Sequence, residues 1–246
     1  MYNYSYCPVC HSNLITIENK IGKCNECSHG FRIAVPEEIL PRYFGKRYWD
    51  NDKNRQGITS VRPSEQWRKW IIARMKLLES FNLINHSVPS KIRIFEFGCA
   101  EGMLLYALKQ KGYNCYGNDI CSITQESKKE LGIDISTLPI EEFTKTDEKF
   151  DLIMSFHVLE HLRNPLEVMI CLSSMLSHNG YMLMHVPIDD QEISNNDHLH
   201  FFSNESCLKL MEQTTTDIRS DLVLYPIRSD STAVAATYVG RSKNIL

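Results

Sequence analysis

The chain has 246 residues, of which 43% are hydrophobic and 23% charged, and its formal net charge is −3. These values are those of an ordinary soluble globular protein that is long enough to bury a core. A membrane-spanning or exported protein is not expected: no apolar run reaches the ~18 residues that cross a bilayer, and the segment from Met1 to Cys10 has neither the basic nor the apolar region of a secretory signal. With nine cysteines, a reducing cytoplasm is the expected compartment.

Residues 1–35 carry two CxxC pairs with thirteen residues between them, formed by Cys7, Cys10, Cys24 and Cys27. This is zinc-ribbon spacing, in which four thiolates complete a closed tetrahedron around a structural zinc ion. A module this short has no sufficient core and needs such a staple to fold. The remaining cysteines are scattered among apolar residues and are expected in the core: Cys99, Cys115, Cys121, Cys171 and Cys207.

Residues 36–88 are basic and aromatic and are expected to form a helical linker or cap. From Arg42 to Lys76 ten basic residues face three acidic ones, a net charge of +7. Such asymmetry indicates an anionic partner, although a solvated helix face has the same composition. Apolar residues at helical spacing predict a helix over 64–82, with Ser64 as its N-cap.

From residue 89 onward, short apolar runs alternate with helical patterns. Strands are predicted at 92–97, 114–118, 133–137, 150–156 and 181–186, and helices at 102–111, 122–131, 164–177 and 204–213. Two further strands, 218–225 and 233–240, are joined by a short polar loop and are therefore expected to be antiparallel neighbours. The alternation predicts an α/β fold with five parallel strands and a terminal antiparallel hairpin, in a domain covering 89–246.

The first of these strands ends in the sequence FEFGCAEG at residues 95–102, where a helix begins. Gly98 and Gly102 allow a sharp turn and a close approach of a ligand to the backbone. The segment resembles the E/D-x-G-x-G-x-G signature of class I methyltransferases, whose Rossmann-like sheet has seven strands, with Ala100 where that family usually has Gly. The resemblance implies that S-adenosylmethionine binds here, through Glu96, Gly98, Cys99, Ala100 and Gly102.

The second strand ends in Gly117-Asn118-Asp119-Ile120, about 20 residues beyond the loop. A carboxylate at this place in a Rossmann-type fold can accept hydrogen bonds from both ribose hydroxyls. Asp119 is therefore the expected ribose ligand, with Ile120 beside it. In related enzymes the adenine contacts come from the end of the third strand, which here implies Leu138 and Ile140. Phe156, at the end of the fourth strand, is also expected against the cofactor.

The fourth strand continues into the sequence FDLIMSFHVLEHL at residues 150–162. This and the downstream HVP and DHLHFFS segments resemble the branch that contains the ubiquinone-biosynthesis O-methyltransferases and many sugar and natural-product methyltransferases. The carboxyl end of a parallel strand is where such sheets hold substrate, which makes His157 a candidate general base. His198 and His200 are expected to line the acceptor pocket.

Another interpretation of these residues is a divalent metal site. His157, Glu160 and His161 have i, i+3, i+4 spacing, and His198 or His200 could join them around a cation. The E-x-x-E-H site of small-RNA 3′-end 2′-O-methyltransferases is similar, with His157 here in place of its first Glu, but the LEH motif also occurs in metal-free relatives.

Two kinds of methyltransferase resemble the whole arrangement, because both place a cysteine module before the catalytic domain. They are sugar C-methyltransferases, with their relatives in glycan gene clusters, and certain ribosomal RNA guanine methyltransferases that begin with CPxC. The first expectation is therefore an enzyme acting on an O, or alternatively an N or C, atom of a sugar, glycan precursor or related metabolite. The alternatives are an RNA methyltransferase that grips nucleic acid through the cysteine module and basic segment, and a non-catalytic scaffold that binds the cofactor.

Overall fold

The computed structural model describes residues 2–35, 65–120, 124–143, 145, 147–188, 198–228 and 231–243. The predicted N-cap Ser64 and most of the basic segment, over residues 42–64, lie outside the described residues. The helix expected after Ser64 is present as α3 (Glu65–Ser80). No helix in the described part of the chain is long and apolar enough to cross a membrane.

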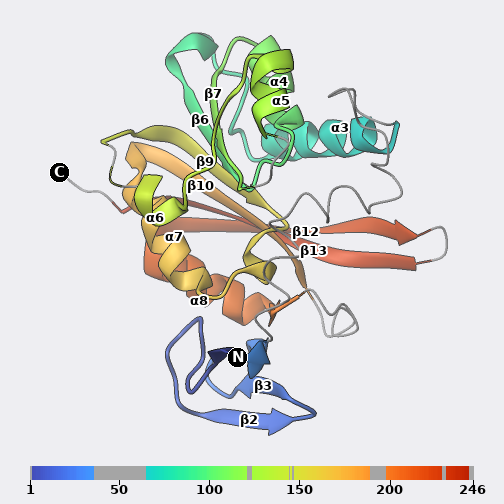
Figure 1. Cartoon of the computed structure of the whole chain (residues 1–246), viewed down its shortest axis with the longest axis vertical. Helices are drawn as coiled ribbons and strands as arrows, with labels where there is room; N and C mark the ends of the chain where they lie inside the picture. The colour runs from blue at the N-terminus through green and yellow to red at the C-terminus, as the bar shows by residue number, and fades with distance from the viewer. Residues whose placement is uncertain are drawn as a thin grey trace.

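A seven-stranded sheet forms the centre of the molecule (Figure 1). Its order is β12-β13-β10-β9-β6-β7-β8, with parallel pairing from β8 to β10 and antiparallel pairing of β13 with both of its neighbours. The strands are β6 (Arg93–Phe97), β7 (Asn114–Asn118), β8 (Asp134–Ser136), β9 (Phe150–Phe156), β10 (Leu176–Ile188), β12 (Thr215–Arg228) and β13 (Ser231–Ser242). The predicted fold class, five parallel strands and a terminal antiparallel hairpin, is confirmed.

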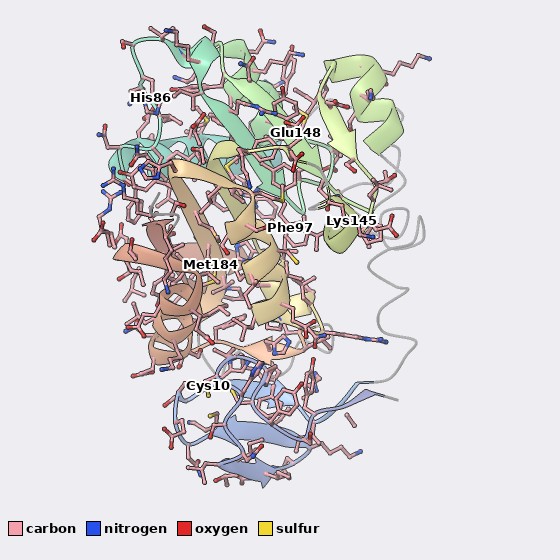
Figure 2. The ribbon with its side chains drawn as sticks, turned by 90° about the vertical axis from the view of Figure 1, so that its left-hand side faces the viewer. Cys10, His86, Phe97, Lys145, Glu148 and Met184 are labelled. Atoms are coloured by element: carbon pink, nitrogen blue, oxygen red, sulfur yellow. The ribbon has the colours of Figure 1, made fainter. Side chains whose placement is uncertain are left out.

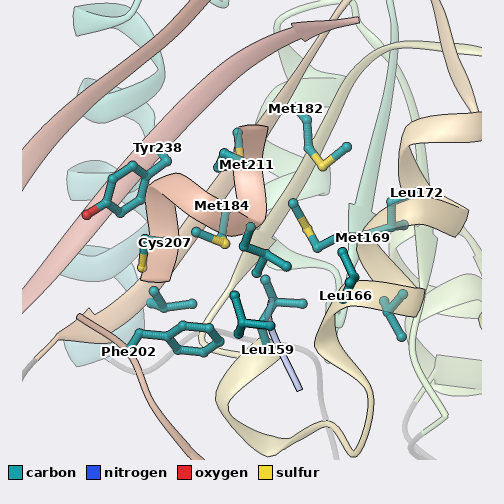
Figure 3. Packing of buried hydrophobic residues seen from close by; sticks show 14 of the residues in the cluster. Leu159, Leu166, Met169, Leu172, Met182, Met184, Phe202, Cys207, Met211 and Tyr238 are labelled. Carbon is teal, nitrogen blue, oxygen red and sulfur yellow. The ribbon is translucent and has the colours of Figure 1, made fainter. Parts of the chain in front are cut away.

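Side chains alternate between two cores on the two faces of this sheet, as the pleat of a strand requires. On β9, Leu152 and Met154 point into one core while Ile153 points into the other. Figure 3 shows the second core, where methionines of α7, α8 and β10 pack with Leu159 and Phe202. Strands buried on both faces read as continuous apolar runs, and this is why the sequence predicted β9 without error at either end.

Helices cover both faces of the sheet (Figure 1). Residues of α3 and α4 (Met103–Gln110) contribute to one core, and residues of α7 (Pro165–Ser174) and α8 (Asn204–Thr214) to the other. The described residues also include α5 (Thr124–Leu131), which corresponds to the helix predicted at 122–131, and the short α6 (Ile140–Phe143), which was not predicted. β10 begins at Leu176, before the predicted start at 181, with a shift of register between Leu176 and Tyr181.

The N-terminal module is a small antiparallel sheet of β2 (Ile15–Glu18), β3 (Ile21–Cys24) and β4 (Gly30–Arg32). A second short pair joins β1 (Tyr2–Asn3) to β5 (Ala34–Val35). The edge strand β4 pairs with β11 (His200–Phe201), which lies far along the chain between β10 and α8. The N-terminal module is thus joined by main-chain hydrogen bonds to the segment between β10 and α8, which nothing in the sequence pattern indicated.

Side chains reinforce this junction. The Tyr4 hydroxyl donates to the carbonyl of Arg163 at 2.5 Å, and the Gln213 amide donates to the carbonyl of Val9 at 2.9 Å. Phe31 is fully buried and packs edge-on to Tyr4, with ring centroids 5.5 Å apart. Figure 2 shows Cys10 in this module and Phe97 in the large sheet.

Candidate functional site

The turn after β6 has the backbone of a ligand-binding loop. Gly98, Ala100 and Gly102 all lie in the left-handed region, with φ of 71°, 48° and 72°. A Cβ on Gly98 would lie 2.2 Å from a methyl carbon of Val158, so no other residue fits there. The amides of Gly98 and Cys99 donate to the carbonyl of Asn118, at 2.8 and 3.2 Å, which folds the loop back over the end of β7.

Asp119 closes the loop from the other side. Its Oδ2 accepts the Ala100 N–H at 2.7 Å, and its own N–H donates to the carbonyl of Ser136 at 3.0 Å. The hydrogen bond to Asp119 holds Ala100 in a left-handed conformation that residues other than glycine rarely adopt. The carboxylate expected to bind ribose is therefore at the junction of the loop, β7 and β8.

Glu96 is a buried carboxyl beneath the loop. Among the described residues, Arg74 of α3 forms an ion pair with it, at 3.9 Å between Nη1 and Oε1, and Oε2 has no hydrogen bond there. Burial, followed by the charges of Asp119 and Glu101, raises the pKa of Glu96 to about 8, against the opposing effect of Arg74. A buried acceptor with an unused oxygen suits a cationic ligand group such as an ammonium.

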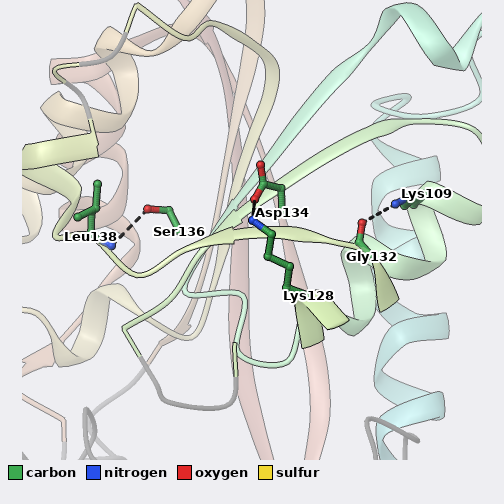
Figure 4. Close-up of polar contacts among 6 residues, drawn as sticks. All are labelled: Lys109, Lys128, Gly132, Asp134, Ser136 and Leu138. Carbon is green, nitrogen blue, oxygen red and sulfur yellow. Dashed lines mark hydrogen bonds and ion pairs between the residues drawn. The ribbon is translucent and has the colours of Figure 1, made fainter. Parts of the chain in front are cut away.

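The residues expected around adenine are separated by the structure. Ile120 and Leu138 follow adjacent strands and are 39% and 46% exposed, whereas Ile140 is buried in the core beside α7. Leu138 is fixed by its backbone: its N–H donates to the Ser136 hydroxyl at 3.2 Å (Figure 4), and its carbonyl accepts from the Asn118 amide at 2.7 Å. Two exposed aliphatic side chains at neighbouring strand ends can hold a flat apolar ring between them.

Cys99 and Phe156 are buried beside the loop, where their side chains fill space. A Cβ on Gly117 would lie 2.6 Å from Cys99 Sγ, so the thiol fills the space that this glycine leaves. The Arg74 guanidinium lies 4.5 Å from the centroid of the Phe156 ring. Arg74 therefore joins Phe156 to Glu96, a role that the sequence pattern missed because an arginine on a helix face is ordinarily solvated.

His157 lies at the carboxyl end of β9 with a strained backbone. Its φ is 55°, its N–H donates to the His185 carbonyl at 2.9 Å, and its Nδ1 is 3.3 Å from Glu160 Oε1. Its side chain is 32% exposed. Burial, and then the charge of Arg74, lower the pKa of His157 to about 3, so the imidazole is neutral at physiological pH and accepts protons only weakly.

His198 and His200 lie behind this turn, at the junction with the N-terminal module. His200 is buried, with Nε2 2.6 Å from the Leu162 carbonyl and Nδ1 3.0 Å from His29 Nε2. Both ring nitrogens of His200 are thus occupied, which leaves none for a methyl acceptor. His198 is buried with its ring 4.9 Å from that of His161.

The four cysteines of the N-terminal module come together. Their sulfur atoms all lie within 4.8 Å of one another, with Cys7 and Cys27 3.7 Å apart and Cys10 and Cys24 3.5 Å apart. These separations are too long for a disulfide bond. Ligands of a tetrahedral zinc with Zn–S bonds of ~2.3 Å are roughly 3.8 Å apart. The cysteine cluster therefore fits a four-thiolate metal ion.

Comparison with known proteins identifies the large sheet. Residues 67–215, more than half of the chain, match the family described as a methyltransferase domain. The chain belongs to this family. The resemblance to methyltransferases inferred from the glycine loop and the LEH motif is confirmed.

Curated relatives match over a shorter stretch. The ubiquinone biosynthesis O-methyltransferase of Pasteurella multocida is 30% identical over 104 residues, which are 36% of this chain and 43% of that protein. The Rickettsia typhi protein of the same name is 25% identical over 122 residues, 47% of this chain and 46% of that protein. The chain thus spans less than half the length of the curated relatives it matches.

Solved structures show the same fold. An N-methyltransferase from Bradyrhizobium japonicum, in complex with S-adenosyl-L-homocysteine, has a TM-score of 0.58 and 17% identity, covering 84% of this chain and 98% of its own. The magnesium protoporphyrin IX methyltransferase of Synechocystis, with bound S-adenosylmethionine, has a TM-score of 0.57 and 14% identity, covering 83% and 98%.

The buried Glu96 predicts a pH-dependent stability in the ligand-free protein. Because the folded-state pKa is about 8, above the ordinary 4.5, the folded protein keeps a proton that the unfolded chain loses, and stability falls as pH rises through that window. Glu96→Gln should remove this loss and raise the free energy of unfolding at about pH 8.5 by on the order of 3 kcal/mol, with little change near pH 5.

Urea unfolding of both proteins at the two pH values measures this difference. Glu142→Gln, at an exposed position, is the matched control and should follow the wild type. If the free energy of unfolding of Glu96→Gln depended on pH as that of the wild type does, the raised pKa of Glu96 would be contradicted.

Proposed function

We propose that the protein is an S-adenosylmethionine-dependent methyltransferase acting on a small molecule. The observation that carries the proposal is the closure of Asp119 on the left-handed loop at Ala100, beside the unsatisfied buried carboxyl of Glu96. A tight glycine loop, a carboxylate at the end of the next strand and a buried acceptor match the backbone-facing part, the ribose and the ammonium group of an amino-acid nucleoside. When bound, the cofactor supplies a methyl group on a positively charged sulfur.

Each part of the site would hold one part of the cofactor. Glu96 would accept from the ammonium group, Asp119 from the ribose hydroxyls, and Ile120 and Leu138 would enclose the adenine. The backbone of Gly98, Cys99, Ala100 and Gly102 would lie against the ligand. The buried side chains of Ile140 and Phe156 would pack beneath the cofactor site. The described geometry fits this group because the polar atoms and exposed apolar side chains converge on the carboxyl ends of β6, β7 and β8.

His157 is proposed to face the methyl acceptor. A neutral imidazole can accept a hydrogen bond from an acceptor hydroxyl and orient its oxygen toward the sulfonium methyl, and positioning of this kind supplies much of the rate in a direct displacement. His198 and His200 are proposed to pack behind the turn that carries His157 and to hold it in place. The proposed acceptor is an oxygen atom of a sugar, glycan precursor or related metabolite. The names of the ubiquinone O-methyltransferase relatives support the choice of oxygen.

Residues 1–35 are proposed to form a zinc ribbon, residues 36–88 a linker or cap, and residues 89–246 the methyltransferase domain. The spacing of the four sulfurs supports a structural zinc ion. A closed set of thiolates leaves no open coordination position, so this ion would stabilise the module rather than react.

The first test concerns the cofactor. Asp119→Asn keeps an oxygen that can accept the Ala100 N–H but loses the charge, and hydrogen bonds to charged groups contribute ~1.5–3 kcal/mol. Affinity for S-adenosylhomocysteine, measured by calorimetry, should therefore fall about 10- to 100-fold. Asp147→Asn, at an exposed position, should bind as the wild type does. An absence of binding heat in the wild type, or equal affinity in Asp119→Asn, would refute the proposed cofactor site.

The second test concerns the acceptor. Incubation with tritiated S-adenosylmethionine and a cell extract, followed by separation into RNA and small molecules, should place the label in the small-molecule fraction, unaffected by ribonuclease. Label in RNA, together with an affinity that falls steeply with salt, would instead support the RNA methyltransferase, because phosphate contacts release counterions. Bound cofactor without transfer to either fraction would support the non-catalytic scaffold.

The third test concerns the zinc ion. Cys24→Ser should lose the zinc that survives dialysis against a chelator, and the segment 1–35 should become sensitive to protease, because the metal supplies its folding free energy. Cys171→Ser, in α7 and away from the cluster, should retain one zinc per chain. Tight zinc in Cys24→Ser, found by elemental analysis, would be incompatible with a four-thiolate site.

A further inference from the structure

A second group of potential metal ligands lies at the turn between β9 and α7. Glu160, His161 and His198 each offer one ligand atom, and these atoms all lie within 4.8 Å of one another. Glu160 and His161 belong to a short 3-10 helix, η2 (Leu159–His161), while His198 arrives from beyond β10. The group is separate from the cysteine cluster and contains no sulfur.

The carboxylate of Glu160 is the unusual member. It is fully buried, and neither of its oxygens has a hydrogen-bond partner within the described residues. Its Oε1 forms ion-pair contacts with His157 Nδ1 at 3.3 Å and with His161 Nε2 at 3.9 Å. The second distance exceeds that of a hydrogen bond. A buried carboxylate without hydrogen bonds is costly unless a cation satisfies it or a proton neutralises it.

Hydrogen bonds to main-chain carbonyls fix the backbone of Glu160 and of His198. The Leu199 N–H donates to the Glu160 carbonyl at 2.8 Å, and the Leu199 carbonyl accepts from the Arg32 N–H at 2.9 Å. Arg32 also donates through Nε to the His198 carbonyl at 2.8 Å. The segment that carries His198 is thus hydrogen-bonded to strand β4 of the N-terminal module on one side and to η2 on the other.

We propose that Glu160, His161 and His198 bind a divalent first-row transition-metal ion, distinct from the ion of the cysteine cluster. Two imidazoles and one carboxylate on one side of an ion leave coordination positions open on the other. The partly exposed side chains of His157 and His161 mark the open side. An oxygen of the methyl acceptor would complete the coordination there; this last step rests on the proposed function, whereas the binding of the ion does not.

Cobalt(II) distinguishes this site from the cysteine cluster. The full chain is first dialysed against a chelator, so that it keeps only the tightly held zinc of the cysteine cluster, and then against Co²⁺, and both metals are counted by elemental analysis. We expect one cobalt in addition to zinc, with weak visible bands and no intense thiolate-to-cobalt charge-transfer band, because its ligands are nitrogen and oxygen. Cobalt that enters only by displacing zinc, with the thiolate band present, overturns the proposal, as does an absence of bound cobalt.

Variants locate the ion. Glu160→Gln keeps the shape and hydrogen-bonding capacity of a protonated carboxyl, so it would be neutral if Glu160 only filled space. We expect instead that cobalt affinity falls more than ~100-fold, because even partners outside the first shell change metal affinity by roughly 10- to 100-fold. His161→Ala, at a side chain that is 20% exposed, should have a similar effect and decides the matter if Glu160→Gln does not fold.

His86→Ala is the matched control, at an exposed histidine outside the cluster, and should bind cobalt as the wild type does. Wild-type affinity in both Glu160→Gln and His161→Ala would overturn the proposal. Calorimetry with S-adenosylhomocysteine on the same wild-type sample separates a failure of the metal site from a failure of the proposed cofactor site.

Discussion

The return of the loop after β6 onto the end of β7 is the constraint on which the candidate site depends. Two amides of the loop share the Asn118 carbonyl, and the Asp119 carboxylate holds Ala100 in a left-handed conformation. The resulting turn is short and leaves β6 and β7 in register to their last residues, with Phe97 opposite Asn118. Every other contact proposed for the cofactor is placed relative to this turn.

Beneath the loop, the surrounding protein shifts the pKa values of two ionisable groups. Burial raises the pKa of Glu96 to about 8 and lowers the pKa of His157 to about 3, and Arg74 affects both groups in the direction expected of a positive charge. Arg74 comes from α3, outside the βαβ units. The helix that precedes the sheet is therefore part of the electrostatics of the site, and the sheet alone does not define it.

Much of this architecture follows from local sequence patterns. β7 and β9 were predicted to the residue, and in β9 the reason is an apolar run that continues to both ends of the strand. The start of β10 was missed because Asn179 and Gly180 interrupt its apolar pattern where the register shifts. The glycine loop was predictable because only glycine fits at position 98, and this requirement is visible in the sequence. By contrast, neither the two-residue β11 nor its pairing with β4 has a periodic signal, so His200 was expected in a pocket rather than at a buried junction.

The shared sheet also has a consequence for how the chain folds. His29 and His200 are 171 positions apart, yet their rings stack with centroids 5.2 Å apart. During synthesis the N-terminal module emerges first, but its edge strand cannot find its partner until most of the polypeptide has left the ribosome. Closing so long a loop is slow. The unpaired edge of β4 is therefore open to intermolecular pairing throughout translation, and the nascent chain carries this aggregation risk until its last third is made.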